Sequence, residues 1–397
     1  MFILKDGMRL LFVIGHLGDY HVPRYEALLQ LAASRGDELF LTEIYGRSGV
    51  YTFPQTRRAG FFARSPAQLV TLENDLTDAG GRRLRIACRL ARVVRNFQPE
   101  VVVTLGYNTS YSLWLCILRH TSRRFSLIYM SDSKADDGRR SPFKESLKRI
   151  LVRRFDGALV AGQRHRAYAQ TLGIPLERSR VGFDVIDVAQ FSRLAEEARA
   201  SDPEIRSLYG LPQRYVLCVS RFIARKNVDV VVDAFARSQL AGQGISLLLV
   251  GQGPGERALR LLASHLQVGE KVCFMRPVPN SEMAAIYALS EFVVLASEFD
   301  QWGLCVNEAF AAARTAIVTV TCGAAEELVL DNINGFIVKP GDTDALAERM
   351  RALVLHDAMR ERLSKQARLT VARWSPAFFA SNLMDLADYI VNSSARR

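Results

Sequence analysis

The sequence predicts an α/β protein made of two Rossmann-like domains. Short β-rich segments alternate with helical segments from the N-terminus, and the alternation restarts after a polar, irregular stretch near residues 192–213. Such alternation is typical of parallel sheets with helices on both faces. The length of 397 residues supports the same division, because one domain typically takes roughly 100–200 residues.

The expected elements follow in order along each half. In the first half we expect a helix over about 23–33 and strands at 9–14, 39–44, 101–105, 127–130 and 158–161. In the second half we expect strands at 215–219, 246–250, 272–274, 292–295 and 316–320. With a linker near 192–213, these assignments predict an N-terminal domain at 1–195, a C-terminal domain at 205–370 and a final helix at 371–397 that packs back on the N-terminal domain.

Composition and the lengths of apolar runs exclude several classes of protein. Hydrophobic residues make up 49% and charged residues 23%, which is near the globular average and excludes a collagen-like or wholly disordered chain. No apolar run approaches the roughly 20 residues that a bilayer span needs. Charged residues interrupt the apolar N-terminus, so we expect a first strand there instead of a signal peptide, and a cytoplasmic protein. The six cysteines have no paired spacing, and we expect neither a disulfide framework nor a metal site.

The net charge of +11 belongs entirely to the first half of the chain. Residues 1–200 hold 31 Lys and Arg against 20 Asp and Glu, whereas residues 201–397 hold 21 of each. The densest basic segments, 82–97 and 143–155, have the spacing of amphipathic helices in which basic residues lie beside an apolar stripe.

Two interpretations of these basic helices stay open. They are ordinary helices whose outer faces are solvated by arginines, such as Arg85, Arg89 and Arg92, or they attract an anionic membrane surface or an acidic substrate. No nucleic-acid-binding motif accompanies the charge, so we expect no nucleic acid partner.

Two loops that follow strands in the second half carry residues suited to phosphate. In the first loop, Arg221 can bind two phosphate oxygens with its planar fork, and Lys226 can act as a point charge. The second loop begins at Gly251 with a G-x-G-x-G run. This run differs from the dinucleotide fingerprint, so tight packing explains it at least as well as phosphate contact does.

The segment 297–308, SEFDQWGLCVNE, is the most informative part of the sequence. Asp300 and Glu308 bracket a turn at Gly303 and Leu304 that begins a helix, where free backbone N–H groups and the helix dipole favour phosphate oxygens. Glu308 can accept hydrogen bonds from both hydroxyls of a ribose, and Asp300 can hold the hydroxyls of a sugar. The structural alternative is that Asp300 caps the helix and Glu308 lies on the surface.

An ordered set of six motifs resembles one known family. The motifs lie at 220–226, 248–255, 272–279, 300–310, 323–329 and 334–342, and in this order they are similar to those of retaining GT-B glycosyltransferases of family 4, the bacterial glycosyl transferases group 1. The resemblance covers residues 215–355 nearly continuously. In the more divergent first half, segments that begin at Ser131, Phe155 and Gly182 look like a bacterial branch of the family.

The resemblance implies a GT-B fold, an α/β architecture in which two Rossmann-like domains face each other across a cleft. The N-terminal domain is then expected to bind the acceptor, and the C-terminal domain the nucleotide sugar. The implied activity is transfer of a sugar from a nucleotide diphosphate sugar to a glycan, a lipid-linked or a small-molecule acceptor, with retention of configuration and without a metal or another cofactor. An oxocarbenium-like ion pair is the implied intermediate, so no enzymic nucleophile is expected.

The resemblance also implies roles for particular residues. Arg221 and Lys226 are expected on the diphosphate, Glu308 on the ribose and Asp300 on the donor sugar. Further donor-binding candidates, some from the resemblance and some from position alone, are Gly15, Gly18, Ser220, Gly251, Arg276, Val278, Trp302, Gly303, Leu304 and Cys305. The acceptor-side candidates are His16, His21, Ser131 and Asp132.

This sequence departs from the family's pattern at three places. The first acid of the usual E-x7-E pair is Asp300, and the usual glycine pair is Gly323–Ala324. Where the family often has a histidine, this chain has Ser131 and Asp132. The histidine-based part of the family's mechanism is therefore not carried over.

Two other functions compete with the transferase. A nucleotide-sugar epimerase or hydrolase on the same fold is the first, and an acid–base pair in the N-terminal loops favours it. A non-catalytic protein that only binds a nucleotide sugar is the second, and the retained Arg221, Lys226 and Glu308 disfavour it. The partners expected for the transferase are the nucleotide-sugar donor, the acceptor and an anionic membrane surface, which places the protein in the cytoplasm and peripherally on the inner face of the membrane.

Overall fold

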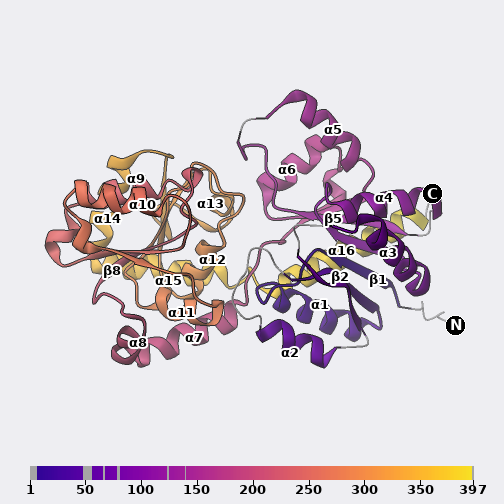
Figure 1. Ribbon diagram of the computed structural model, residues 1–397, viewed down its shortest axis with the longest axis horizontal. Coiled ribbons are helices and arrows are strands. Elements are labelled where there is room, and N and C mark those ends of the chain that lie inside the picture. The colour runs from indigo at the N-terminus through magenta and orange to yellow at the C-terminus, as the bar shows by residue number, and fades with distance from the viewer. Residues whose placement is uncertain are drawn as a thin grey trace. The chain divides into compact units, whose positions relative to one another are not determined.

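The structure is a computed structural model, and it describes residues 7–47, 56–65, 68–77, 81–122, 125–138 and 140–395. Contacts divide the chain into two compact units (Figure 1). The N-terminal unit comprises residues 1–135, 139–185 and 376–397, and the C-terminal unit comprises residues 136–138 and 186–375. Each unit is an α/β domain built on its own sheet, as the sequence predicts.

The first unit contains a seven-stranded parallel sheet in the order β3-β2-β1-β4-β5-β6-β7. Its strands are β1 (Arg9–Ile14), β2 (Glu38–Arg47), β3 (Leu69–Thr77), β4 (Val101–Leu105), β5 (Ser126–Ser131), β6 (Gly157–Val160) and β7 (Ser179–Val181). Its helices are α1 (Val22–Arg35), α2 (Thr56–Arg64), α3 (Arg83–Phe97), α4 (Ser110–Ser122), α5 (Pro142–Val152), α6 (Gln163–Leu172) and α16 (Pro376–Ala395). Two of these strands were not predicted from the sequence: β3 is polar over much of its length, and β7 has three residues.

The second unit contains a six-stranded parallel sheet in the order β10-β9-β8-β11-β12-β13. Its strands are β8 (Tyr215–Val219), β9 (Ser246–Val250), β10 (Val272–Met275), β11 (Val293–Leu295), β12 (Ala316–Thr319) and β13 (Gly335–Val338), and only β13 was not expected. Its helices are α7 (Val188–Ala200), α8 (Asp202–Tyr209), α9 (Val228–Arg237), α10 (Glu256–His265), α11 (Asn280–Ala288), α12 (Leu304–Ala311), α13 (Gly323–Leu328), α14 (Thr343–Leu355) and α15 (Asp357–Val371).

The expected irregular linker at 192–213 is wrong, because α7 and α8 occupy most of it. Asp187 caps α7 by accepting a hydrogen bond from the backbone of Gln190. Pro203 stands in the first turn of α8, where its missing N–H costs no helical hydrogen bond. The break between the two units lies between Val185 and Ile186, and the boundary expected at residue 195 falls inside α7.

Each sheet reverses its strand order beside its first strand. In the N-terminal unit β1 lies between β2 and β4, and in the C-terminal unit β8 lies between β9 and β11. Chain connections leave the two central strands of such a sheet in opposite directions, so the loops at their carboxyl ends separate and leave room for a ligand. The loops that follow β1, β4, β8 and β11 are therefore the places to look for function.

The last helix, α16, belongs to the N-terminal unit although it follows the whole C-terminal unit in sequence (Figure 1, yellow). It packs against α1, β6 and β7, and the ring of its Phe379 is fully buried, 6.3 Å from the ring of Tyr25. Gly157 allows this close approach, because a Cβ atom there would lie 2.5 Å from Cδ1 of Ile390. Within the described part of the chain, no helix has the length and hydropathy needed to cross a membrane.

We expect Phe379→Ala to lower the free energy of unfolding by about 3–5 kcal/mol, because it leaves a cavity between α16 and α1. Urea denaturation followed by circular dichroism measures the change. Leu369→Ala is the matched control, since the Leu369 side chain is 63% exposed, and it should change the unfolding free energy by less than about 0.5 kcal/mol. Equal effects of the two substitutions would contradict the docking of α16.

Candidate functional site

The predicted residues of the second half come together on neighbouring loops at the carboxyl edge of the sheet. The loops after β8 and β9 are joined by a hydrogen bond from the backbone N–H of Phe222 to the carbonyl of Gln252, 3.0 Å long. The loops after β11 and β12 are joined by a backbone bridge between Asp300 and Cys322. Because β8 and β11 are the central strands, these loops flank the reversal of strand order in this unit.

Packing between two of these loops requires Gly251, which was predicted to bind the donor. A Cβ atom at Gly251 would lie 1.8 Å from the carbonyl oxygen of Ser220, and one at Gly253 would lie 2.5 Å from that of Phe222. No side chain fits at such distances, so the glycines let the loop after β9 stack on the loop after β8. The packing interpretation of the G-x-G-x-G run therefore has direct support.

Lys226 and Asp300 form an ion pair between the loops after β8 and β11. The ammonium group of Lys226 contacts Oδ2 of Asp300, and the hydroxyl of Ser297 donates to the same oxygen over 3.2 Å. The two side chains are only 12% and 10% exposed, so each charge depends on the other for its compensation. Asp300 is not the cap of α12, because Gly303 occupies that position without a side-chain cap. The capping alternative for Asp300 is wrong.

Glu308 lies in α12 and is buried, so the alternative that places it on the surface is also wrong. The hydroxyl of Tyr287 in α11 donates a 2.6 Å hydrogen bond to Oε2 of Glu308 and fixes the carboxylate. Tyr287 could not be predicted from the sequence, because a tyrosine among apolar residues of a helix carries no signal of its partner.

The turn before α12 is held in a conformation that favours glycine. Gly303 has φ +95°, and a Cβ atom there would also clash with Cys322. Leu304 and Cys305 begin the helix, half-buried, and burial raises the pKa of the Cys305 thiol well above its ordinary value. Trp302, in contrast, is buried with its ring 5.2 Å from that of Trp374, so its side chain is part of the core.

Several polar groups at this edge remain available to a ligand. The buried hydroxyl of Ser220 and the buried amide nitrogen of Asn307 have no hydrogen-bond partner among the described residues. Arg221 is exposed and forms no ion pair within the described ranges. After β10, Arg276 is exposed with its guanidinium 3.3 Å from Oε1 of Gln252, and Val278 is half-buried.

The N-terminal unit presents its candidates on the loop that follows β1. Gly15 and Gly18 are both buried, and their carbonyl oxygens accept hydrogen bonds from the backbones of Tyr45 and His21. The loop is thus tied to β2 at one end and to the start of α1 at the other.

His16, on the same loop, is held by Glu43 of β2. Its Nδ1 lies 3.0 Å from the carbonyl oxygen of Tyr45 and 3.2 Å from Oε1 of Glu43. Both oxygens only accept, so Nδ1 carries a proton, and the buried Nε2 has no partner in the described part of the chain. Burial lowers the pKa of His16, but the hydrogen bonds that His16 donates to Glu43 and Tyr45 and the charge of Glu43 outweigh it, so the pKa is raised.

Glu43 is fully buried and has further hydrogen-bond partners besides His16. It accepts hydrogen bonds from the backbone of Leu17 over 2.7 Å, the guanidinium of Arg58 over 2.6 Å and the hydroxyl of Thr71 over 2.8 Å. Although burial raises the pKa of Glu43, hydrogen bonds from His16, Arg58 and Leu17 and the charge of Arg58 lower it below its ordinary value overall. A carboxylate inside the apolar run of β2 is the sequence signal that could have identified this cluster, since a buried charge needs partners.

The other acceptor-side candidates differ from His16. Burial and the charge of Arg24 lower the pKa of His21 to about 3, so His21 is neutral at physiological pH. Ser131 ends β5, and its hydroxyl accepts a hydrogen bond from the backbone of Ser133; Asp132 follows it directly. Described contacts do not bring Ser131 or Asp132 to the His16 cluster.

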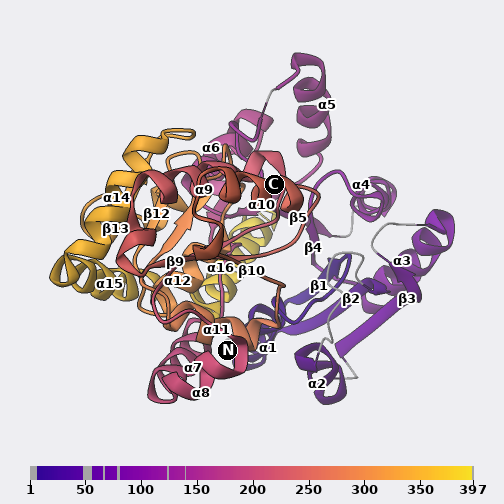
Figure 2. The ribbon, with the colours of Figure 1, turned by 60° about the vertical axis from the view of Figure 1, so that its left-hand side comes forward.

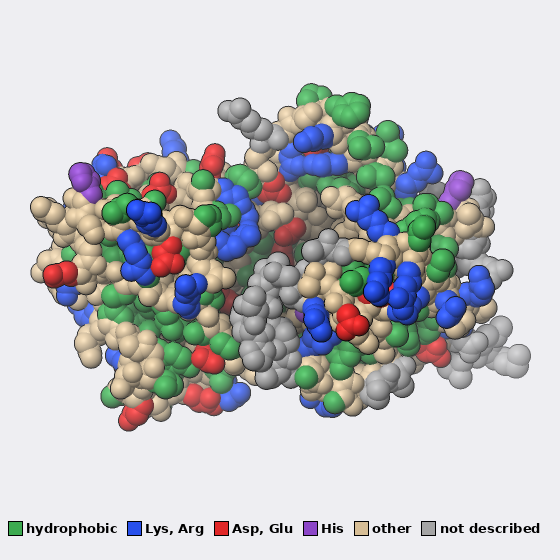
Figure 3. Space-filling model, in the orientation of Figure 1, with side chains coloured by type: hydrophobic (Ala, Val, Ile, Leu, Met, Phe, Trp, Pro, Cys, Tyr) green, Lys and Arg blue, Asp and Glu red, His purple; other side chains and the backbone are tan. Residues whose placement is uncertain are grey.

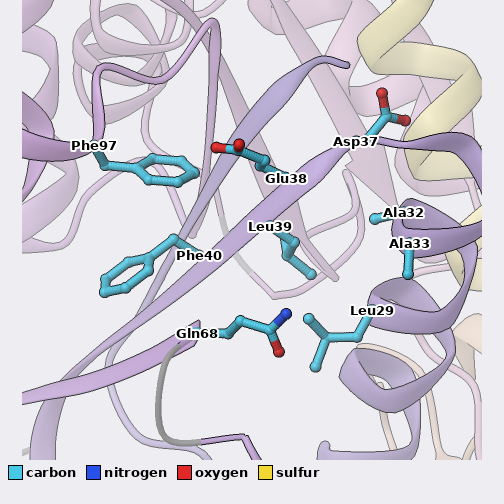
Figure 4. A pocket seen from close by; sticks show the side chains of 9 residues that line it. All are labelled: Leu29, Ala32, Ala33, Asp37, Glu38, Leu39, Phe40, Gln68 and Phe97. Carbon is cyan, nitrogen blue, oxygen red and sulfur yellow. The ribbon is translucent and has the colours of Figure 1, made fainter. Parts of the chain in front are cut away.

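A cavity of about 250 Å³ lies elsewhere in the N-terminal unit (Figure 4). Leu29 of α1, Phe40 of β2 and Phe97 of α3 line it, beside the amino end of β2. Ligands of open α/β sheets bind at the carboxyl ends of the strands, so this cavity is not part of the candidate site.

Replacing Glu43 by Gln should lower the pKa of His16 to below its ordinary value of 6.5, because burial then acts without the carboxylate. An NMR titration of the His16 ring in the wild type and the variant measures this shift. Thr71→Val is the control, since it removes a hydrogen bond from the other oxygen of Glu43 and keeps the charge. An unchanged His16 titration in Glu43→Gln would refute the pairing.

Comparison with known sequences finds a family match within the C-terminal unit. Residues 203–370 match the family described as glycosyl transferases group 1. The chain is 27% identical over 238 residues to the alpha-D-kanosaminyltransferase of Streptomyces kanamyceticus, covering 59% of this chain and 60% of that one. It is 33% identical over 159 residues to a GDP-mannose-dependent alpha-(1-6)-phosphatidylinositol monomannoside mannosyltransferase of Mycolicibacterium smegmatis, covering 37% and 41%. The chain therefore spans about half the length of these curated relatives.

Solved structures resemble the whole chain in fold. A glycosyltransferase from Rickettsia africae has a TM-score of 0.75 at 17% identity, covering 97% of this chain and 99% of that one. The Anabaena protein HepE, in complex with UDP and glucose, has a TM-score of 0.72 at 15% identity, covering 95% and 98%. The two parallel α/β sheets and these matches agree on a GT-B fold. Residues 203–370 thus match the glycosyl transferases group 1 family, and the fold of the whole chain agrees with that match.

Proposed function

We propose that the protein is a retaining glycosyltransferase that moves a sugar from a nucleotide diphosphate sugar to a glycan, lipid-linked or small-molecule acceptor. The observation that carries the proposal is the buried Glu308, held by Tyr287, beside the Lys226–Asp300 pair at the strand-order reversal of a group 1 domain. The names of the relatives and the UDP bound in the Anabaena structure support a nucleotide diphosphate donor.

In this proposal each residue has a distinct task. Glu308 accepts hydrogen bonds from the ribose hydroxyls, and Tyr287 keeps its carboxylate oriented for them. Arg221 binds the diphosphate as a cation that no described carboxylate neutralises, and Lys226 adds a second positive charge. Asp300 binds hydroxyls of the donor sugar, while its salt bridge with Lys226 connects the sugar end of the donor to the phosphate end.

The chemical step needs stabilisation of negative charge on the leaving group. The bond between the anomeric carbon and the diphosphate oxygen breaks, and the acceptor hydroxyl attacks the same face through an oxocarbenium-like ion pair. The proton of that hydroxyl passes to the departing phosphate oxygen, and the nucleoside diphosphate leaves. Preorganised positive charge aimed at a developing anion lowers such a barrier. Arg221, Lys226 and the start of α12 at Gly303 supply that charge, so we propose a reaction that needs no metal and no enzymic nucleophile.

The His16–Glu43 pair supports a second candidate function. An imidazole on the loop after β1 and a carboxylate of β2 in direct contact are the elements of an acid–base pair, which a nucleotide-sugar epimerase or hydrolase would need. Such an enzyme changes or hydrolyses the donor without an acceptor. Incubation with UDP-, GDP- and ADP-sugars in the absence of an acceptor, followed by analysis for free sugar and epimerised donor, separates this function from transfer.

For the setting of the reaction, we propose an acceptor at an anionic membrane surface on the cytoplasmic side. The net positive charge of residues 1–200 supports this location, because summed basic charge attracts acidic lipid. The names of the relatives mention both lipid acceptors, such as phosphatidylinositol monomannoside, and small acceptors, such as inositol 3-phosphate, so the proposal includes all three acceptor classes.

Sugar transfer should continue in the presence of EDTA, because protein cations compensate the diphosphate charge. The assay measures nucleotide release from UDP-, GDP- and ADP-sugars, with an acceptor panel of glycans, lipid-linked sugars and small alcohols. NMR of the product should give the same anomeric configuration as the donor. Loss of activity in EDTA that Mg²⁺ or Mn²⁺ restores would contradict metal independence, and an inverted product would contradict retention.

Arg221→Ala should slow transfer by roughly 10²–10³-fold and leave thermal stability unchanged, because the side chain is exposed and forms no ion pair with a described residue. Arg373→Ala is the matched control, as another exposed arginine without such a pair, and it should keep wild-type rates. Lys226→Ala is less specific, because it leaves Asp300 buried without its cation and should also destabilise the unit. Wild-type turnover in Arg221→Ala would refute its role on the diphosphate.

A further inference from the structure

Helix α5 of the N-terminal unit turns its apolar side toward solvent. Phe143, Leu147 and Ile150 recur at helical spacing and are 80%, 51% and 58% exposed. Val152 is the one residue of α5 that is buried. An ordinary surface helix buries such a stripe, so the interpretation of α5 as an ordinary helix with an arginine-solvated outer face is wrong.

Polar contacts fix α5 in this orientation. The hydroxyl of Tyr168 in α6 donates a 2.7 Å hydrogen bond to Glu145, and the ammonium of Lys148 lies 2.8 Å from the same carboxylate. Arg140, just before α5, lies with its guanidinium 4.6 Å from the Tyr168 ring. Glu145 and Lys148 thus attach the helix to α6, and rotation that buried the apolar stripe would break these contacts.

Cations flank the exposed stripe on both sides. At about 3.6 residues per turn, Lys144 lies on one side of the stripe, Arg153 lies on the other, and Arg154 lies at its C-terminal end. All three are exposed and form no ion pair with any residue that the structure describes. Figure 3 shows hydrophobic side chains gathered over α5 with Lys and Arg side chains next to them, and in Figure 2 the helix projects from the body of its unit.

We propose that α5 docks on an anionic lipid bilayer, with Phe143, Leu147 and Ile150 inserted between the headgroups and the flanking cations bound to lipid phosphates. A helix with an apolar face, basic flanks and an exposed aromatic residue has the composition of interfacial helices. A second copy of the chain fits the face poorly, because it would bring Lys144, Arg153 and Arg154 against the same cations. The inference rests on the proposed membrane location and names the element that makes the contact.

The basic helix α3 has a different role. Arg82, Arg85 and Arg89 surround the buried carboxylate of Glu73 in β3, and Ile86 and Leu90 are buried beneath them. Part of the charge of α3 therefore compensates a carboxylate of its own unit. This leaves α5 as the better lipid-binding element of the two.

Vesicle sedimentation of the full chain tests the proposal, with neutral phosphatidylcholine vesicles and with vesicles that also contain phosphatidylglycerol. The wild type should bind the anionic vesicles, and binding should fall as salt rises, because the Debye length is about 10 Å near 0.1 M salt. The triple variant Phe143→Ala, Leu147→Ala, Ile150→Ala should bind at least about tenfold more weakly. The triple variant Lys144→Gln, Arg153→Gln, Arg154→Gln should lose on the order of 100-fold.

The matched control removes three exposed leucines of the C-terminal unit, Leu208→Ala, Leu261→Ala and Leu369→Ala, and should bind as the wild type does. Equal binding to neutral and anionic vesicles, or wild-type binding by either α5 variant, would overturn the proposal. A dimer that the apolar variant abolishes, without vesicle binding by the wild type, would assign the face to a second copy instead. The assay measures lipid binding and not sugar transfer. The membrane proposal can therefore be wrong while the proposed reaction is right, and the proposed reaction can be wrong while the membrane proposal is right.

Discussion

Both sheets are parallel throughout, and in each the strand order reverses beside the first strand of the unit. Parallel strands bring their carboxyl ends to one edge, and the reversal separates the loops of the two central strands, so each unit has one place where a ligand can reach backbone and side chains together. In the C-terminal unit that place holds Arg221, Lys226, Asp300 and Glu308. In the N-terminal unit it holds the loop from Gly15 to His21. The proposed chemistry therefore depends first on the parallel sheets and their reversal of strand order, which bring these residues to one edge.

Charge buried at these edges is compensated within each unit. Asp300 is paired with Lys226, and Glu43 is surrounded by His16, Arg58 and Thr71. A buried pair contributes little net stability, while the loss of one partner leaves the other charge uncompensated. Such pairs therefore hold side chains in defined positions more than they stabilise the fold. In the C-terminal unit this fixes the distance between the group proposed for the sugar and the group proposed for the phosphates.

Two helices with the same kind of sequence pattern have opposite roles in the structure. Both α3 and α5 carry an apolar stripe beside basic residues, yet α3 buries Ile86 and Leu90 and α5 exposes Phe143 and Leu147. The difference comes from their neighbours. Glu73 of β3 holds the arginines of α3, whereas Tyr168 of α6 holds the polar side of α5. Hydrophobic periodicity predicts that a helix has an apolar side, and the neighbouring elements determine where that side points.

The sequence by itself determined the α/β class and the division into two units, because buried parallel strands are continuous apolar runs. It also indicated the family that residues 203–370 match, because the 297–308 segment carries its chemistry in consecutive residues. Strands without that signal, such as the polar β3 and the short β7, could not be predicted, and the polar stretch that contains α7 and α8 was mistaken for a linker. Only the tertiary structure decided which side chains meet. Tyr287 reaches Glu308 from another helix, and Glu43 reaches His16 from another strand. Contacts of this kind join residues more than 20 positions apart, and their partners are set by the packing of whole elements, which no local pattern encodes.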